Sequence, residues 1–248
     1  MNIIIYFLIN YQGFTVSPAL VDKTVFGTEQ ITEAFELENF SDDSLRIKIE
    51  FEDFDISVLG DVNFLEAGSI PNSLAPLAIV NPEEFSIGPK QIEKIRVTFQ
   101  IPQDAKTPEH SSMLLFKSQP IPTKYQPMIS VAGEIGIPIY ISDAAVANKN
   151  AGFEDLYVTH DTVFTTFRNI GNTHLRVKGE AKILLDDEKV IEKDSIREFV
   201  IFPGKIRKLK VPLTKIKKTV AKGDTCIIRI RLDYGAVELL EAERRFIR

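Results

Sequence analysis

The side chains that carry most enzyme chemistry are scarce in this chain of 248 residues. Cys226 is the only cysteine, which excludes an intramolecular disulfide, a CxxC redox pair and a cysteine-cluster zinc site. The histidines, His110, His160 and His174, do not have the spacing of a helical metal site, and no HExxH motif occurs. We therefore expect no metal site and no cofactor.

Motifs for nucleophilic catalysis or nucleotide binding are missing too: neither GxSxG nor GxGxxG nor a P-loop occurs. Adjacent carboxylates at residues 42–43, 83–84 and 186–187 lie beside turn residues. We interpret them as solvated, with a surface calcium site as the alternative. The chain is therefore predicted to be non-enzymatic, with no catalytic residues.

A basic stretch is the most concentrated charge feature. Residues 204–223 carry eight cations and no carboxylate. In the strand expected there, Ile206, Leu209 and Val211 would pack inward while most cations stay in water. Such a face could meet phosphate, anionic lipid or an acidic protein surface, or be merely solvated. Because it has no aromatic stacking residues and the whole chain is acidic, no nucleic acid partner is expected. The predicted basic face comprises Lys205, Arg207, Lys208, Lys210, Lys215, Lys217 and Lys218.

Charge also divides the chain. Residues 1–150 hold 10 Lys and Arg against 20 Asp and Glu, whereas residues 151–248 hold 20 against 15, so the net charge of -5 is the sum of -10 and +5. We expect the basic part to attract the acidic part or an acidic partner, and salt to weaken that attraction. The 44% hydrophobic and 26% charged residues are typical of a soluble globular protein.

Short segments of alternating apolar and polar residues make up most of the chain from Phe14 onward. In LRIKIEF, residues 45–51, apolar and charged side chains fall on opposite faces, as in a half-buried antiparallel strand. Helical turns are expected only around residues 74–78 and 213–220, and residues 237–246 are ambiguous between strand and helix. The prediction is an all-β protein.

An internal repeat predicts two related domains. NFSDDSLRIKIE (residues 39–50) aligns with NIGNTHLRVKGE (169–180) at an offset of 130, and FSIGPKQIEKIRVTF (85–99) aligns with FVIFPGKIRKLKVPL (199–213) at an offset of 114. Turn residues every 8 to 12 positions favour two tandem immunoglobulin-like β-sandwich domains.

The expected domains are residues 14–142 and 153–248, joined by a linker at 143–152 rich in small and polar residues. Residues 1–13 contain an apolar run that is too short to span a bilayer. We interpret them as a possible truncated signal segment, with a first β-strand as the alternative. No transmembrane segment is expected, and the oligomeric state stays open.

The order of motifs in the first half resembles the periplasmic pilus chaperones of the PapD-like type. It runs from FTVSPALVDKTVF (14–26) through SLAPLAIVNPEEFSIGPKQIEKIRVTFQIP (73–102) to ISVAGEIGIPIYIS (129–142). The resemblance implies a protein in the periplasm or outside the cell that assists assembly of pilus or surface subunits by β-strand addition and through its interdomain cleft. The alternative is a structural or adhesive cell-envelope protein without clients.

The resemblance also implies partner-binding residues. Lys23 occupies the place of one of two basic residues that anchor a subunit's terminal carboxylate in the family, and no second basic residue occurs from 125 to 148. The donated strand would present Ile129, Val131, Ile135, Ile137 and Ile139. Gly133 weakens this strand and Pro138 cannot donate to a ladder, so the segment is expected to border a sheet edge. An ordinary last strand of the sandwich is the alternative.

Overall fold

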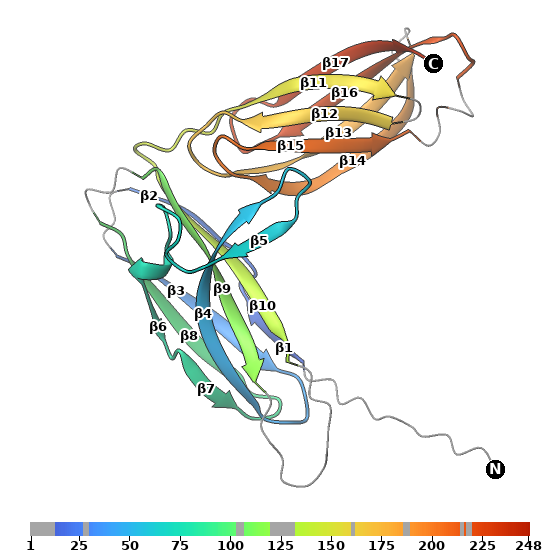
Figure 1. The fold of residues 1–248 in the computed structure, drawn as a ribbon. Helices are drawn as coiled ribbons and strands as arrows, with labels where there is room; N and C mark the ends of the chain where they lie inside the picture. The colour runs from blue at the N-terminus through green and yellow to red at the C-terminus, as the bar shows by residue number, and fades with distance from the viewer. Residues whose placement is uncertain are drawn as a thin grey trace, which may run out of the picture. The chain divides into compact units, whose positions relative to one another are not determined.

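The computed structural model describes residues 13–26, 30–102, 107–119, 132–159, 162–185, 189–213, 216 and 220–248. The chain divides into two compact units, one of Met1–Asp53 and Leu65–Asp143 and the other of Phe54–Phe64 and Ala144–Arg248. Nearly all regular structure is β-strand (Figure 1). The predicted fold class, all-β with two immunoglobulin-like sandwiches, is confirmed. Residues 1–12 of the predicted signal segment lie outside the described residues.

Two sheets enclose the core of the first unit. Their strand orders are β1-β3-β8-β6 and β2-β10-β9-β4-β5, with β7 also pairing with β4. Most of β5 and the last residues of β4 belong to the segment Phe54–Phe64, which is part of the second unit. A 3-10 turn, Ala75–Leu77, falls where a helical turn was expected. The strands are β1 (Phe14–Ser17), β2 (Val21–Val25), β3 (Gln30–Asn39), β4 (Leu45–Ile56), β5 (Val62–Leu65), β6 (Ala78–Asn81), β7 (Glu84–Ile87), β8 (Ile92–Gln100), β9 (Glu109–Gln119) and β10 (Glu134–Asp143).

Alternation along each strand decides which side chains form this core. In β4, Leu45, Ile47 and Ile49 are buried in the first core cluster, whereas Arg46 and Lys48 are exposed. The same period of two operates in β3 and β8, because successive side chains of a strand point to opposite faces. The predicted half-buried strand at residues 45–51 is therefore confirmed.

The second unit has a three-stranded sheet, β11-β12-β15, and a four-stranded sheet, β14-β13-β16-β17. The C-terminal segment that was ambiguous in the sequence is strand β17, not a helix. The strands are β11 (Ala151–Thr159), β12 (Thr162–Asn169), β13 (Leu175–Leu185), β14 (Val190–Ile201), β15 (Ile206–Pro212), β16 (Thr225–Asp233) and β17 (Leu240–Ile247).

The repeat reappears as one hydrogen-bond pattern built twice. Asn39 Nδ2 donates to the carbonyls of Asp43 (2.8 Å) and Gly88 (3.0 Å), with Ile87 O at 3.5 Å. Its backbone N–H donates to Gln91 O (3.0 Å).

Asn169 repeats this arrangement. Its Nδ2 donates to Thr173 O (2.8 Å) and Ile201 O (3.0 Å), and its backbone N–H donates to Lys205 O (3.1 Å). Thr173 follows Asp43 by 130 residues, and Ile201 follows Ile87 by 114, the two offsets found in the sequence. Each asparagine thus joins the end of one strand to the turn between two others.

The first two strands belong to different sheets. β1 pairs antiparallel with β3, whereas β2 pairs parallel with β10. The parallel pairing covers only Ile139–Asp143 of β10. The preceding half of β10 therefore has β9 as its one strand partner among the described residues.

Candidate partner-binding edge

The first half of β10, residues 134–138, forms a free sheet edge within the described part of the chain. On one side these residues pair antiparallel with β9, from Glu134 opposite Lys117 to Pro138 opposite Met113. On the other side the pairing with β2 begins only at Ile139, which lies opposite Val21. We name residues 134–138 the β10 edge.

The hydrogen-bond phase shows which main-chain groups point outward. Ser118 N donates to Gly133 O (2.8 Å), so odd-numbered residues of β10 direct their N–H and C=O groups toward β9. Even-numbered residues direct theirs away from it. Glu134 and Gly136 therefore each present a donor and an acceptor at the β10 edge, whereas Pro138 has no N–H and its carbonyl faces β2, where the pairing of Ile139 with Val21 begins.

The isoleucines predicted to bind a partner face the protein's own core. Ile137 and Ile139 are 1% and 0% exposed in the first core cluster, and partly buried Ile135 packs against that cluster. The side chains of Ile137 and Ile139 are thus not offered to a partner in this structure, whereas Ile135 keeps part of its surface exposed beside the main chain of the β10 edge. Ile129 and Val131 lie outside the described residues.

Lys23 forms an ion pair within the first unit. It lies on β2 opposite Ile141, and its Nζ contacts Glu33 Oε1 of β3. Sequence reasoning missed Glu33, although a signal was present: Glu33 has the inward parity of Ile31 and Phe35 in β3. A lone carboxylate on an apolar strand face indicates a nearby cation, because burying an unpaired charge is costly.

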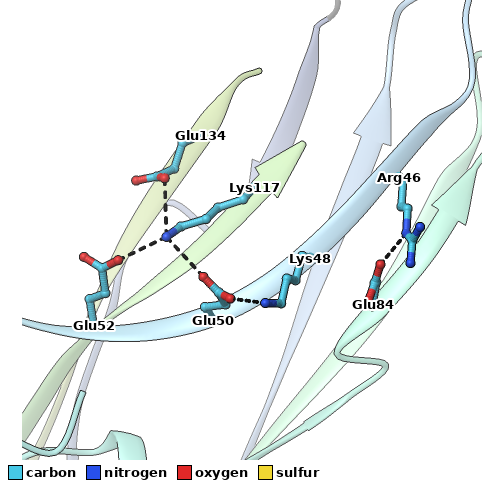
Figure 2. Close-up of polar contacts among 7 residues, drawn as sticks. All are labelled: Arg46, Lys48, Glu50, Glu52, Glu84, Lys117 and Glu134. Atoms are coloured by element: carbon cyan, nitrogen blue, oxygen red, sulfur yellow. Dashed lines mark hydrogen bonds and ion pairs between the residues drawn. The ribbon is translucent and has the colours of Figure 1, made fainter. Parts of the chain in front are cut away.

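A charge network covers the outer face of the sheet next to the β10 edge (Figure 2). Lys117 Nζ of β9 lies 3.0 Å from Glu52 Oε1 and 3.1 Å from Glu50 Oε2, both of β4, and 3.7 Å from Glu134 Oε2 of β10. Lys48 contacts Glu50 as well. Glu134 has the longest of the three contacts with Lys117, and it belongs to the strand at the free edge.

The network shifts the protonation of its members. Hydrogen bonds from Lys48 and then Lys117 hold the pKa of Glu50 below its usual value, despite partial desolvation. The hydrogen bond to Glu52, followed by that to Glu50, raises the pKa of Lys117. Both shifts favour the charged forms of these two side chains.

The predicted basic face is only partly a free cationic surface. Lys205 Nζ lies 2.7 Å from Asp55 Oδ2, and Arg207 lies over the Phe199 ring at 5.5 Å from its centroid. Lys208 and Lys210 are exposed. Lys215, Lys217 and Lys218 lie outside the described residues.

Arg207 also corrects the predicted orientation of β15. The expectation that Ile206 packs inward with Leu209 and Val211 is wrong, because Arg207 shares their parity and lies opposite the core residue Phe167. Burial lowers the pKa of Arg207. Gly60, in the segment 54–64 of the same unit, has a φ of +103°, which L side chains rarely adopt, and a Cβ there would lie 1.8 Å from the guanidinium and require it to move.

Metal-binding clusters and membrane-spanning helices are both absent from the residues that the structure describes. No group of three His, Cys, Asp or Glu side chains is placed to hold a metal ion in that part of the chain. None of its helices is long and apolar enough to cross a bilayer. His110, on β9, is 7% exposed, and desolvation lowers its pKa.

Comparison with known proteins finds similarity only at the level of structure. No protein-family model and no curated protein matches the sequence. The class 5 fimbriae chaperone CfaA matches with a TM-score of 0.53 and 16% identity, over 94% of this chain and 99% of that chain. The complex of the chaperone CsuC with the tip subunit CsuE, from archaic chaperone-usher pili of Acinetobacter baumannii, gives 0.54 and 12%, over 93% and 97%. The complex of Salmonella enterica SafA pilin with the SafB chaperone gives 0.50 and 12%, over 95% and 96%.

Proposed function

We propose that this chain, which has the two-domain β-sandwich fold of the fimbrial chaperones, is a non-enzymatic chaperone-like protein that binds another protein by β-strand addition. The binding element is the β10 edge. The proposed partner is a pilus or surface subunit, and the proposed compartment is the periplasm or cell exterior, as the chaperone resemblance implies.

The free main chain of the β10 edge is the observation that carries this proposal. An antiparallel partner strand could form two hydrogen bonds at Glu134 and two at Gly136. Main-chain pairing of this kind supplies affinity, and side chains on alternate positions supply specificity. Gly136 is exposed, so no side chain of its own hinders the approach of a partner.

Inward-facing side chains of the added strand would also gain apolar contacts. They would lie next to Ile135, which is only partly buried. Across the sandwich, the Phe14 ring of β1 approaches this strand, since a Cβ at Gly133 would be 3.5 Å from it. We propose that a partner with alternating apolar residues covers this part of the core.

Lys23 keeps a proposed role as an anchor for a partner's terminal carboxylate. That role requires its ammonium to exchange Glu33 for the partner, because the two side chains form an ion pair. A Lys forms a point-charge contact there in place of the bidentate pair of an Arg.

Gly136→Pro tests the function against a closely matched variant. Proline removes one outward N–H, whereas Gly136→Ala keeps it, and both add a Cβ that meets the flexible side chains of Leu115 and Met113 at 3.1 Å. The full chain is expressed with a secretory signal in a bacterium that assembles pili, and retained proteins are identified by mass spectrometry.

The proposal predicts a retained subunit that is lost with Gly136→Pro and kept with Gly136→Ala. Circular dichroism verifies that both variants fold. Equal retention by the two variants would contradict strand addition at this edge. Self-association of the pure chain without any retained subunit would favour the structural or adhesive alternative.

A further inference from the structure

We propose that the strand accepted by the β10 edge carries a Lys or Arg opposite Glu134 and a bulky apolar side chain two residues away, opposite Gly136. This inference rests on the proposed function, since it specifies which side chains the added strand must bring. It concerns the outer face of the sheet, where alternate residues of that strand would lie.

The register places three charged residues in one row across the sheet. Lys117 lies opposite Lys48 of β4 on one side and opposite Glu134 of β10 on the other. Residues directly opposite each other on neighbouring strands share a face and interact. The next position in this row, on an added strand, is therefore the cross-strand neighbour of Glu134.

The Glu134 carboxylate is only weakly paired, so it can bind a cation at that neighbouring position. Lys117 is shared by three carboxylates, and its Nζ is 3.7 Å from Glu134 but only 3.0 Å from Glu52. The network around this ammonium has one more negative than positive charge. Its cations are Lys48 and Lys117, and its anions are Glu50, Glu52 and Glu134 (Figure 2). The Glu134 side chain is 47% exposed, and a cation on the added strand would neutralise the excess negative charge of the network.

The following row lacks a side chain at the edge. It runs from Glu50 through Leu115 to Gly136. Leu115 and Met113 lie close beside Gly136, because a Cβ there would be 3.1 Å from each, and both are buried. A large apolar group opposite Gly136 would cover this glycine and extend the apolar surface of its neighbours, as aromatic residues do beside edge glycines.

Synthetic peptides test the inference with the full chain. Each has valines on one face and Thr, Lys, Phe and Thr on the other, with Lys and Phe two residues apart and in either order. Companion peptides replace the Lys by Gln or Glu, or the Phe by Ser. Binding is measured by fluorescence anisotropy in low salt and at about 0.5 M salt, where the Debye length falls to a few ångströms.

The charge of the peptide residue opposite Glu134 should change the affinity in a defined order. The Lys peptide should bind about two- to fivefold more tightly than the Gln peptide, and the Glu peptide more weakly than both, with smaller differences in high salt. Glu134→Lys should reverse the order. Glu36→Lys makes the same charge change on β3, where Glu36 pairs with Lys94 at 3.1 Å, and should leave the order unchanged.

The outcomes separate this inference from the proposed function. If charge has no effect on peptide binding but Gly136→Pro abolishes it, the inference falls and strand addition stands. An order that Glu134→Lys does not alter, or Phe and Ser peptides of equal affinity, also overturns the inference. If no peptide binds in any form, strand addition at the β10 edge is itself contradicted.

Discussion

Asn169→Ala should strongly destabilise the second unit, because this side chain is fully buried and bonded on both ends of its amide. Nδ2 donates to Thr173 O and Ile201 O, and Gly171 N donates to Oδ1 at 2.9 Å. Truncation leaves two carbonyls and one N–H without their partner. Each such loss costs about 1 kcal/mol or more in a buried site, so the expected decrease in the free energy of unfolding is roughly 2–4 kcal/mol.

The assay is urea unfolding followed by circular dichroism, since the chain contains no Trp. With an m-value of roughly 1.5 kcal/mol per molar urea, the transition of the second unit should move down by about 2 M. Asn39→Ala should have a similar effect on the first unit, because its side chain makes the corresponding bonds.

Asn172→Ala is the matched control. Asn172 Oδ1 accepts from Asn148 N (2.6 Å), and its Nδ2 donates to Val146 O (2.9 Å), but both bonds are exposed. Because water can replace these hydrogen bonds, Asn172→Ala is expected to lower the free energy of unfolding by less than about 1 kcal/mol. If Asn169→Ala and Asn172→Ala lowered the free energy of unfolding equally, the argument that the buried hydrogen bonds of Asn169 stabilise the turn more than exposed ones would be refuted.

Further predictions concern charge and pH. Lys117→Met should lower stability by about 1 kcal/mol at pH 7. This loss should become smaller in acid, because the lowered pKa of Glu50 stabilises the fold above the unfolded pKa of 4.5, and that stabilisation is lost as pH falls through the folded pKa. Urea midpoints at pH 7 and at pH 3.5 measure both changes. The lowered pKa of His110 should make stability decline as pH falls below 6.5, and His110→Gln should flatten that decline in the same assay. Glu33→Gln should free Lys23, so that a peptide with a terminal carboxylate gains affinity over its amide in anisotropy measurements.

Much of the fold follows from local patterns in the sequence. The alternation in LRIKIEF predicted which residues of β4 are buried, because one face of that strand packs on the core and the other meets water. The repeat predicted the position of Asn169 from Asn39, since both copies need an amide at the same turn. Such features depend on a few neighbouring residues.

Features that depend on pairing between distant segments could not be predicted in this way. Alternation grouped Ile135, Ile137 and Ile139 on one face, but it could not show that this face is the core side. The parallel pairing of β2 with β10 joins residues more than 100 positions apart and has no local signal. The extent of the free edge therefore came only from the structure.

The prediction of how β15 is oriented was wrong for a related reason. Ile206 and Arg207 are adjacent, so one residue of register decides which of them faces inward. Pairing with β12 places Arg207 opposite Phe167, and the guanidinium lies over Phe199. Hydrophobicity alone favoured Ile206, whereas the aromatic surface and Gly60 accommodate the arginine.

Residue-resolved amide hydrogen exchange across the β10 edge tests the central claim most directly. Without a partner, the amides of Glu134 and Gly136 should exchange rapidly, while those of Ile135 and Ile137, which pair with β9, should be protected. Binding of a partner strand should slow exchange at Glu134 and Gly136 alone among these four. Protection of both amides in the free protein, or unchanged exchange on binding, would contradict strand addition at the β10 edge.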